Sequence, residues 1–218
     1  MGVKLHGQGF VITEAQATTL GVEHLSEKSH LIRPYCTSRG LVQSGLGNYV
    51  IDLFGLTAEQ LRSEFPAIYQ WVFDRVKPER DYNKRASYRD KWWIFGEPRA
   101  DLRPALATIR RYVATARTAK HRIFVFLDSA TIAESEVVCI ASDDAYVLGV
   151  LSGDLHVVWA LASGGRLGVG NDPRYNNSRC FNTFPFPTAA PDQQARIRDL
   201  AEQVDAHRKR KQAQHADL

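Results

Sequence analysis

The chain has 218 residues, of which 44% are hydrophobic, and its formal net charge is +4; this length and composition predict a folded globular protein with one good core, or one large domain and an appendage. No apolar run reaches the roughly 18 residues that a transmembrane helix needs, and the first six residues lack the apolar core of a signal peptide, so we expect a cytoplasmic protein without a membrane partner. The cysteines are far apart in sequence, which argues against a disulfide framework or a clustered zinc site and favours buried free thiols at Cys36, Cys139 and Cys180.

Two helix-capping motifs predict where helices begin in the first seventy residues. Thr13 with Gln16, and Thr57 with Gln60, have the spacing of a capping box. A helix should therefore follow each threonine, and the second helix should break near Pro66. After that proline, apolar residues recur at helical spacing and predict another helix with one face in the core. The β-branched and aromatic residues elsewhere predict strands at 10–13, 31–35 and 47–54.

Residues 71–122 are strongly basic. They carry a net charge of +8, whereas residues 123–164 contain no Lys or Arg and carry a net charge of −6. This charge distribution favours a basic face that attracts phosphates by counterion release, without sequence preference. The alternative interpretation is a solvent-exposed basic surface that binds no phosphate. Residues 77–91 mix basic and aromatic side chains without an apolar period, so we expect a helix end followed by a loop. Trp92–Phe95 should then form a buried strand, with its adjacent tryptophans on opposite faces.

The second half of the chain continues the mixture of elements. A helix capped by Asp143 and Asp144 should reach Leu151, and a longer helix should follow over residues 154–163. A flexible glycine-rich loop is expected at residues 164–170. Further strands are expected at 112–115, 123–127 and 137–141.

A last helix should begin at Asp192 and end at the basic run 208–211. Its apolar face would carry Ile197, Leu200 and Val204. Taken together, these elements predict an α+β fold of short, mostly antiparallel strands with packed helices.

The motifs of common enzyme classes are missing from the sequence. It contains no Gly-x-Ser-x-Gly elbow, no Walker loop and no His-Glu-x-x-His. Asp128, Glu134 and Glu136 could hold Mg²⁺ in a nuclease, but no lysine follows them at a useful spacing. We expect these acids to cap turns and to repel misplaced phosphates. His156 lies among apolar residues and is expected to be a packing residue, so we predict neither a catalytic residue nor a metal site.

Cationic and amide side chains gather in three segments, at residues 77–91, 115–122 and 164–179. Arg and Asn side chains can bond base edges, whereas other cations position the protein on phosphates. In residues 115–122, small side chains would let the backbone come close to DNA, and the long cationic side chains could reach into the major groove. The alternative is that this segment is a basic hairpin tip exposed to solvent. We expect base contacts from Arg117, Lys120, Arg122, Asn176, Asn177 and Arg179. We expect phosphate contacts from Lys84, Arg85, Arg89, Arg166 and Arg174.

One order of motifs is fairly specific: it runs from Gly165-Arg166-Leu167 to Phe184-Pro185-Phe186-Pro187. Individually weaker segments accompany it at 30–35, 49–56, 75–80, 92–99, 111–115 and 148–152. Over essentially its whole length, the chain resembles the C-terminal target-recognition region of class I S-adenosylmethionine-dependent DNA methyltransferases. The resemblance is to enzymes of the MmeI restriction-modification type and to related phage-defence methylases.

The resemblance implies a target-recognition-domain fold over residues 1–190 and the start of a C-terminal spacer helix over residues 191–218. It also implies a parent enzyme that methylates adenine N6 with S-adenosylmethionine, in a catalytic domain outside this chain. The Asn/Asp-Pro-Pro-Tyr/Phe motif of such a domain is missing, because Asn171-Asp172-Pro173-Arg174 lacks the second proline and the aromatic residue. We therefore expect the chain to bind double-stranded DNA, to bind no cofactor itself and to transfer no methyl group.

Two alternatives remain open from the sequence. A specificity or protein-interaction subunit would dock on a separate methylase through the final helix and Phe184–Pro187. A metal nuclease would cleave DNA only with Mg²⁺.

Overall fold

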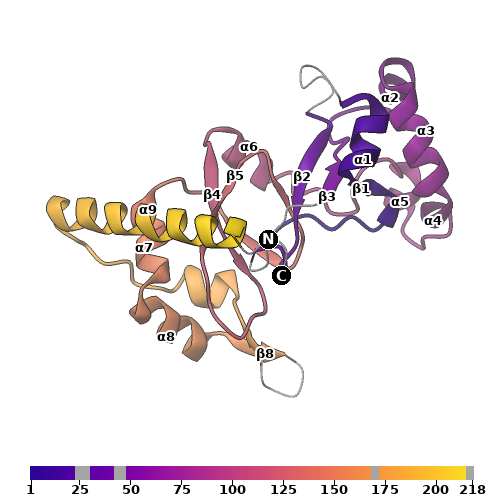
Figure 1. Ribbon diagram of the computed structural model, residues 1–218. Helices are drawn as coiled ribbons and strands as arrows, with labels where there is room; N and C mark the ends of the chain where they lie inside the picture. Colours follow the sequence, from indigo (N-terminus) through magenta and orange to yellow (C-terminus); the bar gives the residue numbers. More distant parts are fainter. Residues whose placement is uncertain (23–29, 42–47, 168–171, 215–218) are drawn as a thin grey trace.

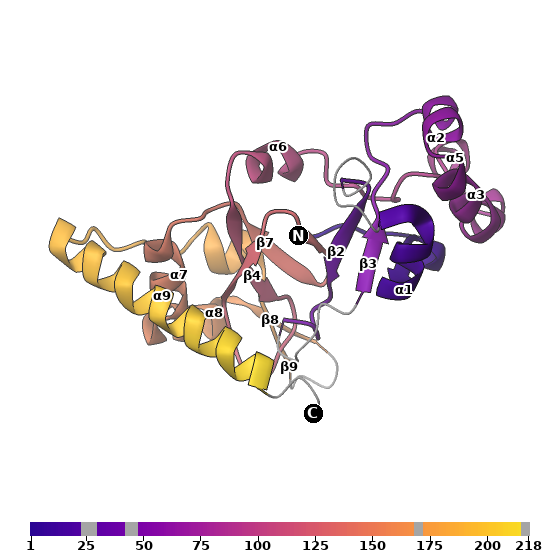
Figure 2. The ribbon, with the colours of Figure 1, turned by 45° about the horizontal axis from the view of Figure 1, so that its top comes forward.

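The computed structural model describes residues 1–22, 30–41, 48–167 and 172–214. An N-terminal lobe lies at one end of the molecule (Figures 1 and 2). Its elements are η1 (Gln8–Phe10), β1 (Val11–Thr13), α1 (Glu14–Ala17), η2 (Thr18–Val22), β2 (Ile32–Cys36), β3 (Asn48–Ile51), α2 (Ala58–Glu64), α3 (Pro66–Arg75), α4 (Lys77–Asp81) and α5 (Ala86–Asp90).

A C-terminal lobe lies beside the first, and its long last helix packs along α7 (Figures 1 and 2). Its elements are α6 (Leu102–Ala107), β4 (Arg111–Ala116), β5 (Val125–Asp128), β6 (Ile132–Ala133), β7 (Val137–Ile140), α7 (Ala145–Ser152), α8 (Asp154–Ser163), β8 (Gly165–Leu167), β9 (Asp172–Arg174), η3 (Asn177–Phe181) and α9 (Pro191–Gln214).

The strands pair mostly in antiparallel fashion, within small sheets. The sheet of the N-terminal lobe has the order β1-β3-β2-β6, in which only the β2–β6 pair is parallel. Because β6 follows β5 in sequence, it carries the chain of the C-terminal lobe back into this first sheet. The second sheet has the order β5-β4-β7, and β8 and β9 form a separate hairpin. The predicted α+β fold with short antiparallel strands is confirmed.

Both predicted capping boxes are present. The Thr13 hydroxyl accepts from the Gln16 amide N–H at 3.3 Å, and the Gln16 side chain accepts from the Thr13 amide at 2.9 Å. Thr57 and Gln60 make the same pair of bonds at 3.1 and 2.9 Å. These bonds satisfy N–H groups that the first helical turn leaves without a backbone partner. Pro66 lies at the start of α3, where its missing N–H costs no hydrogen bond.

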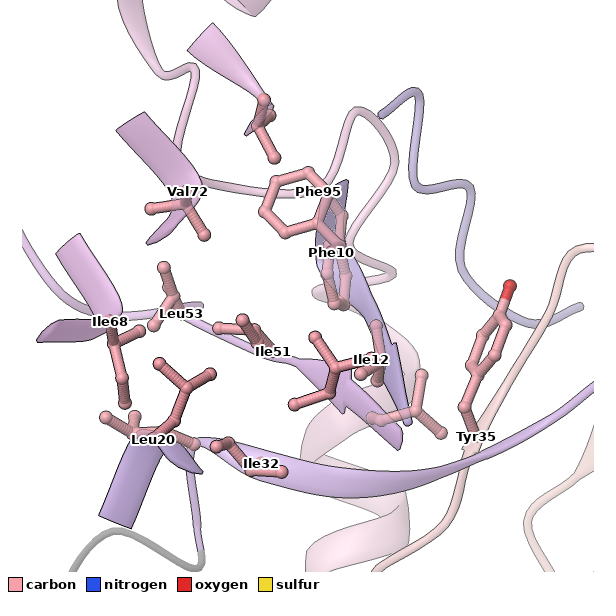
Figure 3. Packing of buried hydrophobic residues seen from close by; sticks show 14 of the residues in the cluster. Phe10, Ile12, Leu20, Ile32, Tyr35, Ile51, Leu53, Ile68, Val72 and Phe95 are labelled. Atoms are coloured by element: carbon pink, nitrogen blue, oxygen red, sulfur yellow. The ribbon is translucent and has the colours of Figure 1, made fainter. Parts of the chain in front are cut away.

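The core of the N-terminal lobe lies between its sheet and α3 (Figure 3). Ile12 and Ile51 from the strands meet Ile68 and Val72, which form the predicted apolar face of α3. In the second sheet, alternate residues of β4 enter different clusters, as the period of a strand requires. The cysteines are buried free thiols, as predicted: Cys36, Cys139 and Cys180.

The strand predicted at Trp92–Phe95 is wrong, since this segment forms turns. Both tryptophans pack on the same core with their ring centroids 5.9 Å apart, rather than on opposite faces. The Trp93 indole donates to the carbonyl of Leu56 at 2.9 Å. Aromatic residues are enriched in strands because they pack well on a half-buried surface, and a buried turn meets the same requirement.

Three further expectations need correction. Residues 77–91 form the two short helices α4 and α5, not a helix end and a loop. The loop expected at 164–170 begins as strand β8, while residues 168–170 lie outside the described residues. The last helix continues through the basic run 208–211 as far as Gln214.

The helices of the C-terminal lobe pack around the second sheet. The Asp144 carboxylate caps α7 by accepting from the Tyr146 amide at 2.8 Å, as predicted. In α9 the buried residues are Ala201 and Asp205, whereas Leu200 and Val204 of the predicted apolar face are 51% and 42% exposed. No single helix in the described part of the chain is long and apolar enough to cross a membrane; only the α7–α8 pair, bent by 65°, passes that test jointly.

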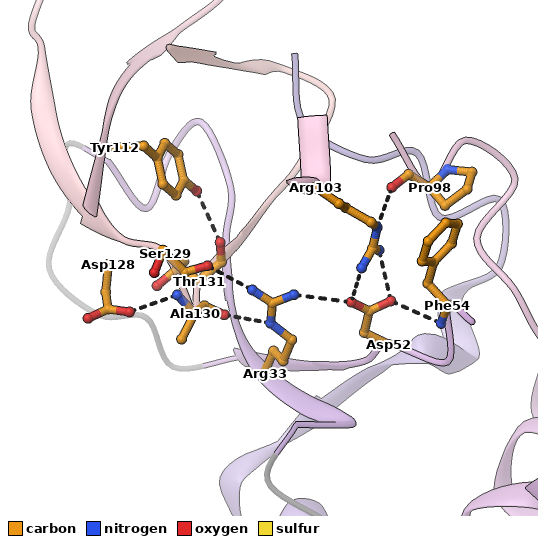
Figure 4. Close-up of polar contacts among 10 residues, drawn as sticks. All are labelled: Arg33, Asp52, Phe54, Pro98, Arg103, Tyr112, Asp128, Ser129, Ala130 and Thr131. Atoms are coloured by element: carbon orange, nitrogen blue, oxygen red, sulfur yellow. Dashed lines mark hydrogen bonds and ion pairs between the residues drawn. The ribbon is translucent and has the colours of Figure 1, made fainter. Parts of the chain in front are cut away.

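A polar junction ties the two lobes together (Figure 4). The Asp52 carboxylate, 4% exposed, accepts from Arg33 at 3.3 Å and from both terminal nitrogens of Arg103 at 2.7 and 2.9 Å. Arg33 also donates to the carbonyls of Ser129 and Ala130, both at 2.8 Å. One buried acid of the N-terminal lobe therefore fixes the turn after β5 through Arg33.

Candidate nucleic-acid interface

Two of the predicted DNA-contacting segments lie side by side. Thr118 forms an isolated antiparallel bridge with Arg174. On one side of this bridge the Tyr175 amide donates to the carbonyl of Arg117 at 2.7 Å, and on the other the Ala119 amide donates to Pro173 at 3.3 Å. We call the exposed side of these two paired segments, residues 117–122 and 172–179, the hairpin edge. The sequence suggested these segments separately, and the fold joins them.

Arg117 lies where β4 leaves the second sheet. Its amide donates to the carbonyl of Glu136 at 2.7 Å, and its guanidinium forms an ion pair with the Glu136 carboxylate at 3.0 Å. The register of β4 and β7, in which Ala116 pairs with Val137, brings these opposite charges together. Part of the basic segment is thus neutralised by the acidic segment within the protein. A known strand pairing would have revealed this partner of Arg117; the separated charge counts alone did not.

Lys120 is the exposed cation at the tip of the turn between β4 and β5. No hydrogen bond or ion pair involves its side chain within residues 1–22, 30–41, 48–167 and 172–214. The neighbouring His121 is also exposed. The ammonium group of Lys120 is therefore available to an anion from outside the protein.

Arg122, predicted to contact a base, is half-buried, and the donors of its guanidinium are directed towards the protein. Its guanidinium donates to the hydroxyl of Thr115 at 3.1 Å, to the carbonyl of Ala116 and, at 3.2 Å, to the carbonyl of Pro173. It also lies over the ring of Tyr175, 5.1 Å from the ring centre. Burial lowers the pKa of Arg122. These contacts direct its donors into the protein, because the chain offers carbonyls on both sides of the side chain.

The amide residues after β9 cap a π-helical turn. The side-chain oxygen of Asn176 accepts from the amide and the hydroxyl of Ser178 at 3.1 and 2.7 Å, so this exposed residue starts η3. The side-chain oxygen of Asn177 is buried and has no partner among the described residues. Arg179, in the same turn, is exposed. Among these residues, Arg179 offers the hairpin edge a second exposed cation.

The hairpin itself places Arg166 on β8 and Arg174 on β9. Arg166 is exposed, and Arg174 is half-buried beside Thr118. Gly164 precedes the hairpin at a close approach: a Cβ atom there would lie 2.5 Å from the carbonyl oxygen of Arg174 and 2.6 Å from that of Ala160. Only glycine lets the end of α8 pass this close to β9.

A buried aromatic group supports the hairpin edge from below. His156 is fully buried, and its Nε2 lies 2.9 Å from the hydroxyl of Tyr175. The rings of Phe124 and Phe184 pack edge-on against His156 at centroid distances of 5.6 and 4.4 Å. Burial, and secondarily the charge of Arg122, lower the pKa of His156 to about 4. The imidazole is therefore neutral at pH 7 and packs in the core as predicted, although its buried Nδ1 has no hydrogen-bond partner among the described residues.

The third predicted segment lies in the other lobe. Arg85 lies just before α5 and Arg89 lies in its last turn. Arg85 donates to the Tyr88 hydroxyl at 3.0 Å, and Arg89 donates to the carbonyl of Asn83 at 2.6 Å. Lys84 is exposed nearby, and Tyr82 is 91% exposed. Figure 1 shows α5 at the far side of the N-terminal lobe and β8 at the bottom of the C-terminal lobe. This basic cluster is thus separate from the hairpin edge.

The acids considered for a metal site have other partners. The Asp128 carboxylate accepts from the Ala130 amide at 2.7 Å, which is the turn cap that the sequence predicted. Glu136 pairs with Arg117, and burial raises the pKa of Glu134. Within the described part of the chain, no three His, Cys, Asp or Glu side chains lie together as metal ligands would.

Comparison with known proteins finds a matching family, a curated relative and similar solved structures. The family model described as "MmeI, target recognition domain" matches residues 1–188. DNA methyltransferase A of Bacillus subtilis (strain 168) is 39% identical over 57 residues, which are 26% of this chain and 6% of that protein. The solved structure of the Type IIL restriction-modification enzyme MmeI in complex with DNA matches with a TM-score of 0.73 and 19% identity, over 92% of this chain and 26% of that one. The chain spans about a quarter or less of the length of these two proteins.

Proposed function

The chain belongs to the MmeI target recognition domain family, and we propose that it recognises a sequence in double-stranded DNA for a DNA methyltransferase. The hairpin edge carries the proposal. Two segments distant in sequence meet there, and together they present Lys120, Asn176 and Arg179 at the surface. Amide and cationic side chains are the groups that bond base edges and phosphates.

The parent enzyme in this proposal methylates adenine N6 with S-adenosylmethionine and acts in restriction-modification or phage defence in the cytoplasm. The catalytic domain and its cofactor site lie outside this chain, which contributes recognition alone. The domain for recognition covers residues 1–190, and residues 191–218 begin a spacer helix. The described start of α9 at Pro191 supports that boundary.

The proposed contacts fall into two classes. Arg117, Lys120, Asn176, Asn177 and Arg179 are the base-contacting residues at the hairpin edge, and for Arg117 this contact requires release from Glu136. The phosphate-contacting residues are Arg166 and Arg174 on the hairpin and Lys84, Arg85 and Arg89 in the N-terminal lobe.

A binding experiment tests this division. Gel-shift titrations on randomised duplexes would compare the wild-type chain with Arg179→Ala, Arg117→Ala and Arg85→Ala. We expect the first two substitutions to change which sequence is preferred, at a cost of about 1–3 kcal/mol for the base concerned, while Arg85→Ala weakens binding to all duplexes equally. Arg110→Ala is the control, because Arg110 is exposed and lies before β4, away from the tip of the β4–β5 turn. Equal losses across all sequences for all of these variants would refute the division.

The exposed apolar residues of α9 favour a second candidate, a specificity subunit that docks on a separate methylase. Leu200 and Val204 are 51% and 42% exposed, and Phe186 of the Phe-Pro-Phe-Pro segment is 37% exposed. Contiguous exposed apolar side chains mark protein contacts more often than chance placement does. Pull-down with a methylase subunit discriminates, when wild-type chain is compared with Leu200→Ser. Loss of capture without loss of DNA binding would assign α9 to docking.

A further inference from the structure

Arg122 occupies an unusual position under the hairpin edge. It belongs to the turn between β4 and β5, yet its guanidinium reaches the carbonyl of Pro173 on β9 at 3.2 Å. The same group bonds the hydroxyl of Thr115 and the carbonyl of Ala116 at the end of β4. One side chain thus holds both segments of the edge from inside. The planar guanidinium suits this arrangement, since its donors point in fixed directions.

Tyr175 extends this connection into the lobe. Its ring lies under the Arg122 guanidinium, and its amide donates to the carbonyl of Arg117 at 2.7 Å. Its hydroxyl meets Nε2 of His156, which is fixed in α8. Tyr175 is 1% exposed and His156 is fully buried, so the packing around both rings holds them in place. A continuous chain of contacts therefore runs from α8 through Tyr175 to Arg122.

The partners of Arg122 leave its charge uncompensated. Within the described part of the chain, no carboxylate forms an ion pair with it. The acceptors are a hydroxyl and carbonyls, which stabilise a cation without cancelling it. The charge stays close beneath the surface that carries Lys120.

We propose that Arg122 is a positioning residue, which fixes the spacing between residues 117–121 and residues 174–179 and thereby sets the DNA sequence preference without touching DNA. This inference rests on the proposed function of the hairpin edge. It assigns the preference to the geometry of the edge as well as to its exposed side chains. Displacement of base-contacting groups by about 1 Å is enough to break a bidentate contact, because hydrogen bonds weaken steeply with distance and angle.

Hydrogen exchange of the free 218-residue chain tests the clamp without DNA. Arg122→Lys keeps the charge but loses the planar fork, and Arg122→Met loses both. For both variants we expect the amides of Ala119 and Tyr175, which bond across the edge, to exchange about tenfold faster, while the amides of the β4–β7 pair keep their protection. Arg110→Met is the matched control and should leave every rate unchanged. Wild-type rates at Ala119 and Tyr175 in Arg122→Lys would overturn the proposal.

DNA titration tests the consequence for specificity. For Arg122→Lys we expect the ratio of affinities between the preferred duplex and single-mismatch duplexes to fall about tenfold, with an unchanged dependence on salt. A merely structural role would lower the melting temperature but leave this ratio unchanged wherever the variant is folded. A phosphate contact would instead lower the salt slope by about 1 in Arg122→Met and leave Arg122→Lys normal. Either of those two outcomes would overturn the proposal.

The two arms separate the inference from the function on which it rests. A wild-type chain that binds all duplexes equally would refute the proposed function, and the exchange rates would still decide whether Arg122 clamps the edge. Sequence preference with normal exchange in both variants would uphold the function and refute the clamp. Should Arg122→Met fail to fold, Arg122→Lys alone decides between these outcomes.

Discussion

Among the arginines that join distant segments of the described chain, those at the lobe junction and at the hairpin edge have different acceptors. At the junction between the lobes, Arg33 and Arg103 both bond the carboxylate of Asp52, which is 4% exposed (Figure 4). At the hairpin edge, Arg122 bonds a hydroxyl and carbonyls instead. The first arrangement pairs both cations with one carboxylate, so these three side chains keep a single net positive charge. The second leaves a positive charge under a surface that already carries exposed cations.

This difference separates two uses of a half-buried guanidinium. A carboxylate partner makes the arginine part of the folding core, and its loss leaves a charge without a partner in a poorly solvated place. The hydroxyl and carbonyl partners of Arg122 fix its side chain beside the hairpin edge, where its positive charge favours the approach of phosphates over distances near the Debye length of about 8 Å. The junction should therefore govern stability, and the hairpin edge should govern binding.

The largest expected effect comes from breaking the junction. Asp52→Asn leaves Arg33 and Arg103 facing a neutral amide, and we expect the free energy of unfolding to fall by about 3–5 kcal/mol. Urea denaturation of the two proteins measures this loss, with Asp90→Asn as a control at an exposed acid. DNA sequence preference should stay as in the wild-type chain. A loss below about 1 kcal/mol would show that water already screens the junction.

Acid should weaken the support of the hairpin edge. The pKa of His156 lies near 4 in the folded protein, against an ordinary value of 6.5, because burial disfavours the charged ring. Below pH 6.5 the unfolded chain therefore binds a proton that the folded chain does not, and stability falls as the pH decreases towards 4. This group alone should remove about 3 kcal/mol at pH 4. Urea denaturation at pH 7 and pH 4 measures this loss of unfolding free energy, and we expect the loss to be smaller in His156→Gln than in the wild-type chain. Equal losses in the two proteins would show that other groups cause the pH dependence.

Glu136 is where we expect the smallest loss of stability, together with a gain in DNA affinity. This carboxylate pairs with Arg117 but is 43% exposed, so Glu136→Gln should cost under about 1 kcal/mol of unfolding free energy. The substitution frees a guanidinium at the hairpin edge and removes a negative charge from it. We expect DNA affinity to rise about threefold or more, with a salt slope that is steeper by about 1. Unchanged affinity would mean that Arg117 stays away from DNA.

Local signals in the sequence were sufficient for much of the fold. The capping boxes at Thr13 and Thr57 depend on residues three positions apart, so their spacing alone located two helices. The same holds for Asp144 at the start of α7. The strand predicted at Trp92–Phe95 failed because those rings are buried through contacts with distant residues such as Leu56, which local propensity does not contain.

The candidate site was predictable in its composition but not in its geometry. The sequence identified residues 115–122 and 164–179 as separate cationic and amide segments, and only the pairing of Thr118 with Arg174 joined them. The same limit explains Arg122. Its half-buried side chain bonds the carbonyl of Pro173 on β9, and no spacing within residues 115–122 predicts that partner.

Photo-crosslinking to duplex DNA tests most directly whether the hairpin edge is the DNA-reading surface. A photo-reactive residue would replace Lys120, Arg179 or, as a control, Leu155, which is 85% exposed on α8. The account predicts crosslinks from positions 120 and 179 to neighbouring nucleotides of one duplex, and none from position 155. Equal crosslinking from position 155, or crosslinks from only one of the two segments of the edge, would contradict it.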